Sequence, residues 1–372
     1  METFDLPAYL NNHHLICCIL VFISSILITL AIIPSIIYVA KTHNLYDNFS
    51  YFRKRHLGAI PRLGGVGIYT GFTVTLLFFG LTDKTTPINY LLAACMILSI
   101  MGIKDDLLGV NPRTKLVIQL ITSLILVIPG NIRISSFHGV FGLYDISYPV
   151  SVVLSLLVII FIINSFNLID GIDGLSAMTG IIVNSVFSAL FIYMGKYELA
   201  TISLAMTGAI IGFIQFNITP AKIFMGDTGA LLIGLISAVM AIKFLEVNKF
   251  TENKSPDVFS APAIALAILI IPVSDALRVF ILRILKGESP FLADRNHIHH
   301  RILKLGFTHM QATTLLIGVN LLMILLACLF ATYGNGFLLI VISLITLMFN
   351  WILSYLIRSK ERESYALRNL FL

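Results

Sequence analysis

A dense group of amide and carboxylate side chains occupies residues 164–175, whose sequence is NSFNLIDGIDGL. Asp170 and Asp173 are three residues apart, a spacing that predicts one shared helix face. The Gly after each Asp removes side-chain bulk, so a ligand or another backbone can approach closely. An apolar run precedes the stretch, and a carboxylate near hydrocarbon is costly unless it is paired, hydrated or bound to a cation. Taken alone, the stretch is explained equally well by a hydrophilic turn between two helices. The other polar clusters of the chain therefore decide between a turn and a functional site.

Further polar clusters interrupt the apolar sequence. Lys104, Asp105 and Asp106 are adjacent, and Lys115 lies beyond them. The other clusters are PRLGG at 61–65, NITPAKIFMGDTG from Asn217 to Gly229, and DRNHIHHR at 294–301. Carboxylates with open positions suit Mg²⁺, which proteins usually hold with one or two of them plus substrate phosphates. The clusters therefore predict the handling of phosphate with a divalent cation.

The acidic residues also have simpler explanations. Adjacent Asp105 and Asp106 cannot both point one way on a helix, so we expect at most one metal ligand, with the other a base or a supporting group. The alternative is a pair that caps the helix end, although an Asp at a helix C-terminus opposes the macrodipole. Asp227 precedes an apolar helix and alone fits an N-cap or a first-turn acid.

His297, His299 and His300 resemble a metal cluster. An H-x-H pair places two imidazoles on one side of a strand, but neither a Cys ligand nor an H-E-x-x-H motif accompanies it. Arg295 and Arg301 flank the histidines, and imidazoles with guanidiniums make a clamp for phosphate. Anion binding is therefore the favoured prediction over zinc.

The elements that must position these residues are membrane spans. Of 372 residues, 58% are hydrophobic and 12% are charged, with a mean hydropathy of +0.94, whereas soluble domains have about a quarter charged. We expect an all-α, polytopic membrane protein that forms a single unit over residues 1–372. Apolar stretches of spanning length predict about eleven transmembrane helices, at 15–39, 60–82, 88–103, 114–130, 148–167, 175–194, 199–217, 228–245, 259–284, 312–333 and 337–357.

The distribution of basic residues predicts the orientation. Most of the 25 Lys and Arg residues fall in loops on one side, which is therefore expected to be cytoplasmic. The N-terminus is then outside, in the periplasm, and the C-terminus is inside. Every polar cluster falls on the cytoplasmic face, although no motif entered the assignment. The net charge of +6 then reflects topology and anionic membrane lipid, without a nucleic-acid partner.

The ordered motifs DD, NxxDGxDGL, GDTG and DRxHIHH resemble those of the polyprenyl-phosphate N-acetylhexosamine-1-phosphate transferases, from residue 61 to residue 301. The resemblance implies transfer of a sugar-1-phosphate from a UDP-sugar to a polyprenyl phosphate, with Mg²⁺ as cofactor, Mn²⁺ as the alternative, and release of UMP. By the same resemblance, the catalytic residues are Asp105, Asp106, Asp170 and His297, and the metal-linked ones are Asn167 and Asp227. The substrate-binding set is Arg62, Lys115, Asp173, Asn217, Arg295, His299 and His300.

Within that family, the DRxHIHH segment and the span count look more like the bacterial undecaprenyl-phosphate N-acetylglucosamine-1-phosphate transferases. The resemblance then implies UDP-GlcNAc as donor, undecaprenyl phosphate as acceptor, the bacterial inner membrane, and the first step of O-antigen, common-antigen or teichoic-acid synthesis. The similar peptidoglycan enzymes carry a TPTMGG-like stretch where this chain has AIPRLGG.

Other functions stay open at this point. One is a transporter or channel, since intramembrane carboxylates mark ion pathways, although repeated halves are not seen. Others are a family member that uses another UDP-N-acetyl sugar, and an intramembrane metalloprotease built on the histidines. The sequence also allows a homodimer, without any signature for one.

Overall fold

The computed structural model describes residues 13–45, 60–80, 87–218, 220–249, 258–287 and 297–370. In these ranges the chain is helical, apart from turns, loops and one isolated β-bridge between Ser136 and Asp145. This confirms the all-α prediction. The elements are α2 (His14–Thr42), α4 (Gly64–Phe79), α5 (Ile88–Leu108), α6 (Pro112–Val127), η1 (Val140–Gly142), α7 (Tyr148–Ile169), α8 (Leu175–Tyr193), α9 (Tyr197–Asn217), α10 (Gly226–Val247), α11 (Ala261–Ile268), α12 (Ile270–Leu285), α13 (Ile298–Lys304), α14 (His309–Leu329), η2 (Ala331–Tyr333) and α15 (Asn335–Leu370).

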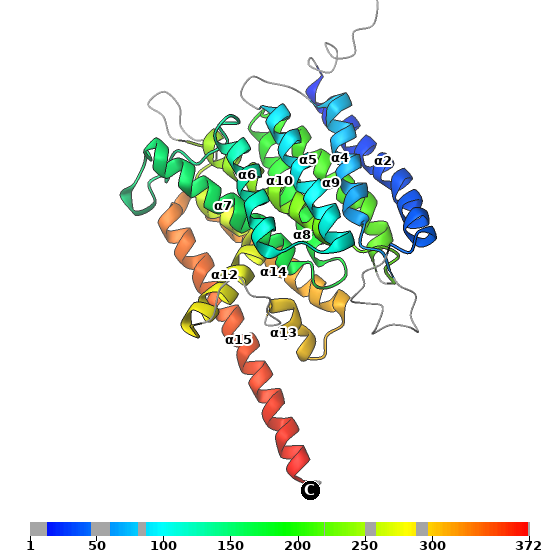
Figure 1. Cartoon of the computed structure of the whole chain (residues 1–372). Coiled ribbons are helices and arrows are strands. Elements are labelled where there is room, and N and C mark those ends of the chain that lie inside the picture. The colour runs from blue at the N-terminus through cyan, green and yellow to red at the C-terminus, as the bar shows by residue number, and fades with distance from the viewer. Residues whose placement is uncertain are drawn as a thin grey trace, which may run out of the picture.

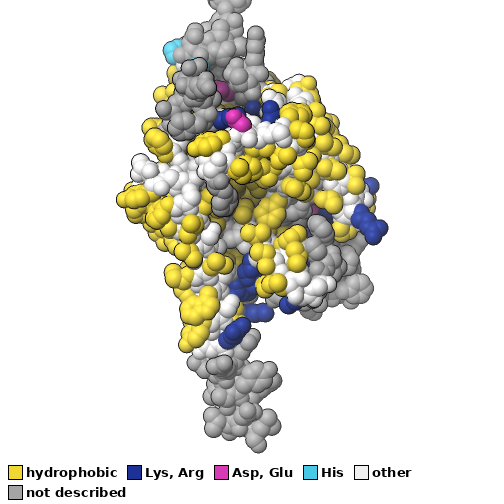
Figure 2. All heavy atoms as spheres, turned by 90° about the vertical axis from the view of Figure 1, so that its left-hand side faces the viewer, with side chains coloured by type: hydrophobic (Ala, Val, Ile, Leu, Met, Phe, Trp, Pro, Cys, Tyr) yellow, Lys and Arg dark blue, Asp and Glu magenta, His cyan; other side chains and the backbone are white. Residues whose placement is uncertain are grey.

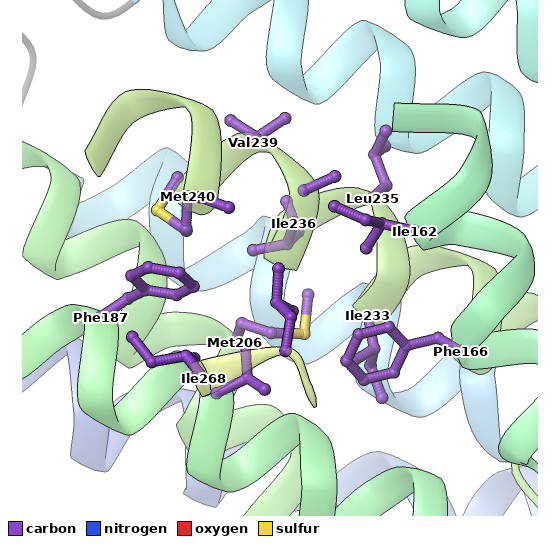
Figure 3. Close-up of a cluster of buried hydrophobic side chains, with 14 of the residues drawn as sticks. Ile162, Phe166, Phe187, Met206, Ile233, Leu235, Ile236, Val239, Met240 and Ile268 are labelled. Atoms are coloured by element: carbon purple, nitrogen blue, oxygen red, sulfur yellow. The ribbon is translucent and has the colours of Figure 1, made fainter. Parts of the chain in front are cut away.

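Helix α10 forms the centre of the bundle. Its run of apolar and small residues carries no Pro, and almost every side chain from Thr228 to Ile242 is buried. Helices α4, α5, α7 and α8 pack around it. Figure 3 shows Ile233 and Ile236 of α10 among Phe166, Phe187 and Met206 from the surrounding helices. A helix buried all round is rigid, so its N-terminus can hold a functional side chain in a fixed place.

The count of eleven spans is not confirmed. Seven helices are long and apolar enough to cross a membrane, or eight if α11 and α12 together count as one span. Helices α4 and α6 each have only 16 residues, which explains part of the difference, because about 20 residues are needed to cross the hydrocarbon. The molecule is nevertheless a multi-pass membrane protein. The predicted sidedness of the termini is not tested by the arrangement of the helices.

The ninth predicted span, residues 259–284, is broken. Helices α11 and α12 meet at an angle of 81°, with Leu269 between them. Pro272 lies in the first turn of α12 and has no backbone N–H to bond the preceding turn. The buried Asn320 of α14 donates instead to the carbonyls of Ala267 and Ile268, at 3.0 and 3.2 Å. The break is thus supplied with the hydrogen bonds that hydrocarbon cannot provide.

The outer surface is largely apolar. Figure 2 shows hydrophobic side chains over most of one side of the molecule, with Lys and Arg side chains mainly at its margins. Helices α2 and α15 contribute many exposed hydrophobic residues, including Leu27, Phe337 and Trp351. Figure 1 shows α15 along one side of the bundle, with its C-terminal part projecting beyond the other helices. Such a surface suits lipid contact.

The packing of neighbouring helices creates two distinct ends. At one end, α5, α7 and α9 finish while α4, α6, α8 and α10 begin, and all the predicted clusters preceding α11 lie there. At the other end, the hairpin-like segment 131–146 joins α6 to α7 and is tied to α10. Glu246 accepts hydrogen bonds from the backbone and the hydroxyl of Ser135, at 2.7 and 2.8 Å. Residues far apart in the sequence therefore meet at the first end.

Candidate active site

An acidic centre forms where α5, α6, α7 and α10 meet. The Lys115 ammonium group lies between two carboxylates: it is 2.6 Å from Asp227 Oδ2 and also contacts Asp105 Oδ2. The Asn167 side chain hydrogen-bonds Asp227 from the last turn of α7. Two helix ends thus direct carboxylate oxygens at one cation, and a third supplies an amide that donates to one of these carboxylates.

Asp106 has a different task from Asp105. Its two carboxylate oxygens accept hydrogen bonds from Asp227 N (2.7 Å), Thr228 N (3.1 Å) and Thr228 Oγ1 (2.6 Å). It therefore caps the N-terminus of α10 from a neighbouring helix, where a negative charge also complements the helix dipole. The two adjacent Asp residues point to different partners, as expected. Capping does occur at α10, and Asp105 Oδ1 also accepts from Val110 N, just beyond the end of α5, at 2.6 Å.

The segment before α10 is packed too tightly for side chains. Gly226 has φ +73°, and a Cβ there would lie 2.2 Å from Arg62 O and 2.6 Å from the Asp106 carboxylate. The backbones of Gly64 and Gly65 donate to Phe224 O and Met225 O, at 2.9 and 2.8 Å. The PRLGG and GDTG motifs are therefore one unit, and it places Arg62 beside the acidic centre.

The DGIDG stretch is a turn. Helix α7 ends at Ile169 and α8 begins at Leu175, so the prediction that Asp170 and Asp173 share a helix face is wrong. The physical reason is Gly174, which takes φ +77° and starts α8 from a left-handed conformation. Asp173 instead faces α14: its carboxylate is 3.7 Å from His309 Nδ1, and its carbonyl accepts from Thr313 Oγ1 at 3.3 Å.

The carboxyl group of Asp170 interacts electrostatically with the carboxylates of the acidic centre. Burial, and then the charges of Asp227 and Asp106, raise the pKa of its carboxyl to about 8, against the opposing charge of Arg62. A group with this pKa exchanges its proton near neutral pH, and perturbed carboxyls of this kind concentrate at functional sites. Asn217 links the DGIDG turn to the segment before α10 by two hydrogen bonds. Its Oδ1 accepts from Gly174 N at 3.1 Å, and its Nδ2 donates to Ile223 O at 3.0 Å.

The histidine segment meets the same turn. His297 precedes α13, and His299 is 1% exposed, with neither ring nitrogen hydrogen-bonded to any residue that the structure describes. A Cβ on Gly171 would lie 2.2 Å from His299 Nε2, so only Gly fits beneath this ring. Burial, followed by the charge of His300, lowers the pKa of His299 to about 4. His299 is thus neutral at pH 7.

The predicted cationic clamp differs from what the structure shows. Arg301 does not extend toward a ligand, because its guanidinium donates to Asn350 Oδ1, Asn350 O and Ser354 Oγ of α15, at 3.0, 3.1 and 2.6 Å. His300 lies beside His299, with ring centroids 4.2 Å apart. Arg295 falls outside the described residues. The segment therefore contributes mainly imidazoles, and its arginine at 301 anchors α13.

Sequence reasoning missed two sets of residues. Asp275 is buried in α12 and pairs with His297 Nδ1 at 3.0 Å. A lone Asp inside an apolar helix was the available signal. Gln119 of α6 and Asn164 of α7 exchange two amide hydrogen bonds, at 3.2 and 2.8 Å, one turn from Lys115 and Asn167 respectively. The amide pair links the two helices that supply those side chains.

The acidic centre has a donor set suited to Mg²⁺. Among the described residues, no group of three or more His, Cys, Asp or Glu side chains is arranged as a metal site. The convergence of Asp105 and Asp227 oxygens on an ammonium ion, with Asn167 bonded to Asp227, nevertheless shows that the place accepts a cation. Carboxylate and amide oxygens fit Mg²⁺, which takes the rest of its ligands from water and substrate phosphates.

A multi-pass membrane protein with clustered carboxylates, a half-buried lysine and histidines at one end of the bundle is typical of enzymes that act on phosphorylated substrates. The chain belongs to glycosyl transferase family 4, whose model matches residues 88–245. It is accordingly a polyprenyl-phosphate sugar-1-phosphate transferase, as the ordered motifs predicted.

Similar proteins match most of the chain. It is 34% identical over 284 residues to the undecaprenyl-phosphate alpha-N-acetylglucosaminyl 1-phosphate transferase of Escherichia coli O157:H7, which is 75% of this chain and 74% of the relative. It is 32% identical over 303 residues to the probable undecaprenyl-phosphate N-acetylglucosaminyl 1-phosphate transferase of Bacillus subtilis, with 80% of each chain covered. It is 31% identical over 284 residues to the undecaprenyl-phosphate alpha-N-acetylglucosaminyl 1-phosphate transferase of Yersinia pestis, with 75% of this chain and 74% of the relative covered.

Proposed function

We propose that this enzyme transfers GlcNAc-1-phosphate from UDP-GlcNAc to undecaprenyl phosphate. A phosphate oxygen of the lipid forms a bond to the β-phosphorus of the donor, the bond from that phosphorus to the bridging oxygen breaks, and UMP leaves. The product is undecaprenyl-pyrophosphoryl-GlcNAc, the starting lipid of a cell-surface glycan. Direct displacement is favoured, because a phosphate monoester is already anionic near neutral pH and needs no covalent enzyme intermediate.

The observation that carries the proposal is the Lys115 ammonium ion held by Asp105 and Asp227. It marks a place, lined by oxygen atoms, where a cation is stable at the end of the bundle. Phosphoryl transfer depends mostly on positioning and on neutralisation of developing charge. Mg²⁺ bound there by Asp227, Asn167 and Asp105 would supply that neutralisation. Lys115, which already pairs with anionic groups, suits the donor phosphates.

The remaining residues divide between support and chemistry. Asp106 is occupied by three donors of α10, so it holds the carboxylate of Asp227 in place. Asp170 can accept or release a proton near neutral pH. It is therefore suited to exchange a proton with the phosphate acceptor, or with the uridine of the donor. Asp173 and Asn217 fix the turn on which Asp170 sits.

The neutral imidazole of His299 suits the uncharged part of the donor better than its pyrophosphate. Neither ring nitrogen has a hydrogen-bond partner among the described residues, which leaves them for a sugar hydroxyl or an N-acetyl group of the donor to bind. Sites built to pair with a polar substrate group strongly reject analogues that lack the group. We therefore assign UDP-GlcNAc as the donor, with UDP-glucose a poor one, in line with the names of the relatives.

The test compares donors with one acceptor. Purified enzyme in detergent is incubated with undecaprenyl phosphate, MgCl₂ and radiolabelled UDP-GlcNAc, UDP-GalNAc, UDP-glucose or UDP-MurNAc-pentapeptide, and the lipid product is extracted and counted. We expect strong labelling with UDP-GlcNAc, equimolar UMP, and loss of both with EDTA. Preferred use of the pentapeptide donor would overturn the assignment. Activity that persists in EDTA would remove the metal.

We also propose that the end of the bundle with the acidic centre faces the cytoplasm of a bacterial inner membrane. The support is the Lys and Arg bias of the sequence together with the location of UDP-sugars, which are made inside the cell. The transporter and protease alternatives have no structural observation in their favour. The described histidines form no metal group, and the carboxylates of the acidic centre lie at one end of the helices.

A further inference from the structure

Asp275 is a carboxylate without any exposed surface on its side chain. It lies in α12, outside every motif of the acidic centre. Both of its oxygens are used: Oδ1 accepts from Ile298 N at 2.8 Å, and Oδ2 pairs with His297 Nδ1 at 3.0 Å. Arg278 is farther away, 3.9 Å from Oδ1. Burial of a charge is costly unless it is paired, so this contact has a strong structural requirement.

The contact determines how the imidazole of His297 is used. A carboxylate next to Nδ1 requires the ring hydrogen on that nitrogen, since two acceptors cannot pair. Nε2 is then the ring nitrogen that Asp275 does not engage, and in the neutral ring it is an acceptor. Without the carboxylate, the ring could rotate or take the other tautomer. Asp275 therefore fixes both the orientation and the chemical character of His297.

The same carboxylate places α13. Ile298 is the first residue of this helix, and its N–H would have no partner because the His297 side chain makes no capping bond. At the other side of α13, Arg301 binds Asn350 and Ser354 of α15. Between these two attachments, His299 rests on Gly171 of the acidic turn. A shift at Asp275 would move the histidines relative to the turn that carries Asp170.

We propose that Asp275 is a positioning residue for the transfer reaction: it holds His297 in one tautomer and orientation next to His299, the residue that packs on the turn carrying Asp170. This inference rests on the proposed function and on the catalytic role that the ordered motifs predict for His297 in it. It predicts that Asp275 and His297 work as one unit, so removing either should make the other dispensable. A purely structural carboxylate would show no such dependence.

The experiment is a double-mutant cycle on the full-length enzyme, with Asp275→Asn, His297→Ala and the double variant. Turnover and KM for UDP-GlcNAc are measured by counting lipid product over long incubations, and folding is checked by thermal unfolding in detergent. Asp275→Asn keeps an acceptor for Ile298 N but can present its NH₂ group to His297. We expect it to lower kcat by about 10- to 100-fold, as loss of a group that orients a ring commonly does. In the His297→Ala background the further loss should be under about threefold.

Two further variants complete the design. Asp275→Glu keeps a carboxylate at this position and should therefore have a higher turnover than Asp275→Asn when His297 is present. In the His297→Ala background, the two substitutions should give the same turnover. Asp275→Glu also provides the cycle if Asp275→Asn fails to fold. Asp145→Asn is the matched control, because Asp145 is exposed and pairs with Lys249 at the opposite end of the bundle. It should leave turnover unchanged.

The outcomes separate the two proposals. Multiplicative losses from Asp275→Asn and His297→Ala would overturn the positioning role, even with His297 essential. Near-normal turnover of His297→Ala would instead contradict the catalytic role that the motifs predict for His297.

Discussion

At the scale of single residues, two adjacent carboxylates divide their work. Asp105 is paired with Lys115 at the cation-binding place, and Asp106 caps α10. We expect Asp105→Asn to reduce turnover by about 10²- to 10⁴-fold with little change in Tm, since a group acting directly on the reaction is lost. Asp106→Asn should reduce turnover and also lower the free energy of unfolding by about 1.5–3 kcal/mol, because charge-assisted bonds to a helix end are lost.

Both variants are measured by UMP release and by thermal unfolding in the same detergent. Near-normal turnover of both would remove the pair from the reaction. Equal losses of stability would show that the division of work is wrong.

Asp170 makes a prediction about pH. Its folded pKa of about 8 lies above the ordinary 3.8, so between these values the folded protein holds a proton that the unfolded chain has released. The free energy of unfolding should therefore fall as the pH rises from about 4 to about 8. Asp170→Asn cannot ionise and should flatten this slope. Thermal unfolding of both proteins in EDTA across this range checks it, and parallel slopes would contradict the raised pKa.

Residue types in the motifs predicted most of this centre, because phosphate chemistry needs carboxylates, amides and bases whatever the fold. The motifs could not show what each side chain bonds. Arg301 looks like an anion ligand in sequence but anchors α13 to α15, and that depends on Asn350 and Ser354, about fifty residues away. Asp275 lies in no motif, and only the fold brings it to His297.

At the scale of elements, the break between α11 and α12 depends on one amide. Asn320→Leu would leave the carbonyls of Ala267 and Ile268 without their donor in an apolar interior. We expect a loss of about 1–3 kcal/mol in the free energy of unfolding. The matched control is Thr207→Val, since its buried hydroxyl bonds only the Ser203 carbonyl of its own helix. Similar losses for the two variants in thermal unfolding would show that Asn320 has no special part in the break.

Apolar run length predicted where helices lie but not how they cross the membrane. Residues 259–284 form one apolar stretch in sequence, yet they fold as two helices at 81°. The bend depends on a donor from α14, which the local sequence does not contain. The DGIDG turn is the reverse case: Gly174 in its left-handed conformation overrides a spacing that fits a helix.

At the scale of the whole molecule, the two ends of the bundle should lie in different compartments. Leu143 is exposed at the hairpin end, and Arg113 is exposed at the end with the acidic centre. In a Cys328→Ser background, Leu143→Cys should react with a membrane-impermeant maleimide in spheroplasts, and Arg113→Cys only after permeabilisation. The other three Cys residues are buried and should stay unlabelled. The opposite pattern would reverse the proposed orientation.

The lysine between the two carboxylates also bears on the order of substrate addition. The two carboxylates are already paired with a cation attached to the chain, whose local concentration is far above that of any free ion. A bare divalent ion would have to displace that ammonium group and leave it without a counter-ion. An ion that arrives on a nucleotide diphosphate brings new negative charge to which the displaced lysine can turn. We therefore expect the enzyme to take up the metal–nucleotide complex as a single substrate and to ignore the free metal.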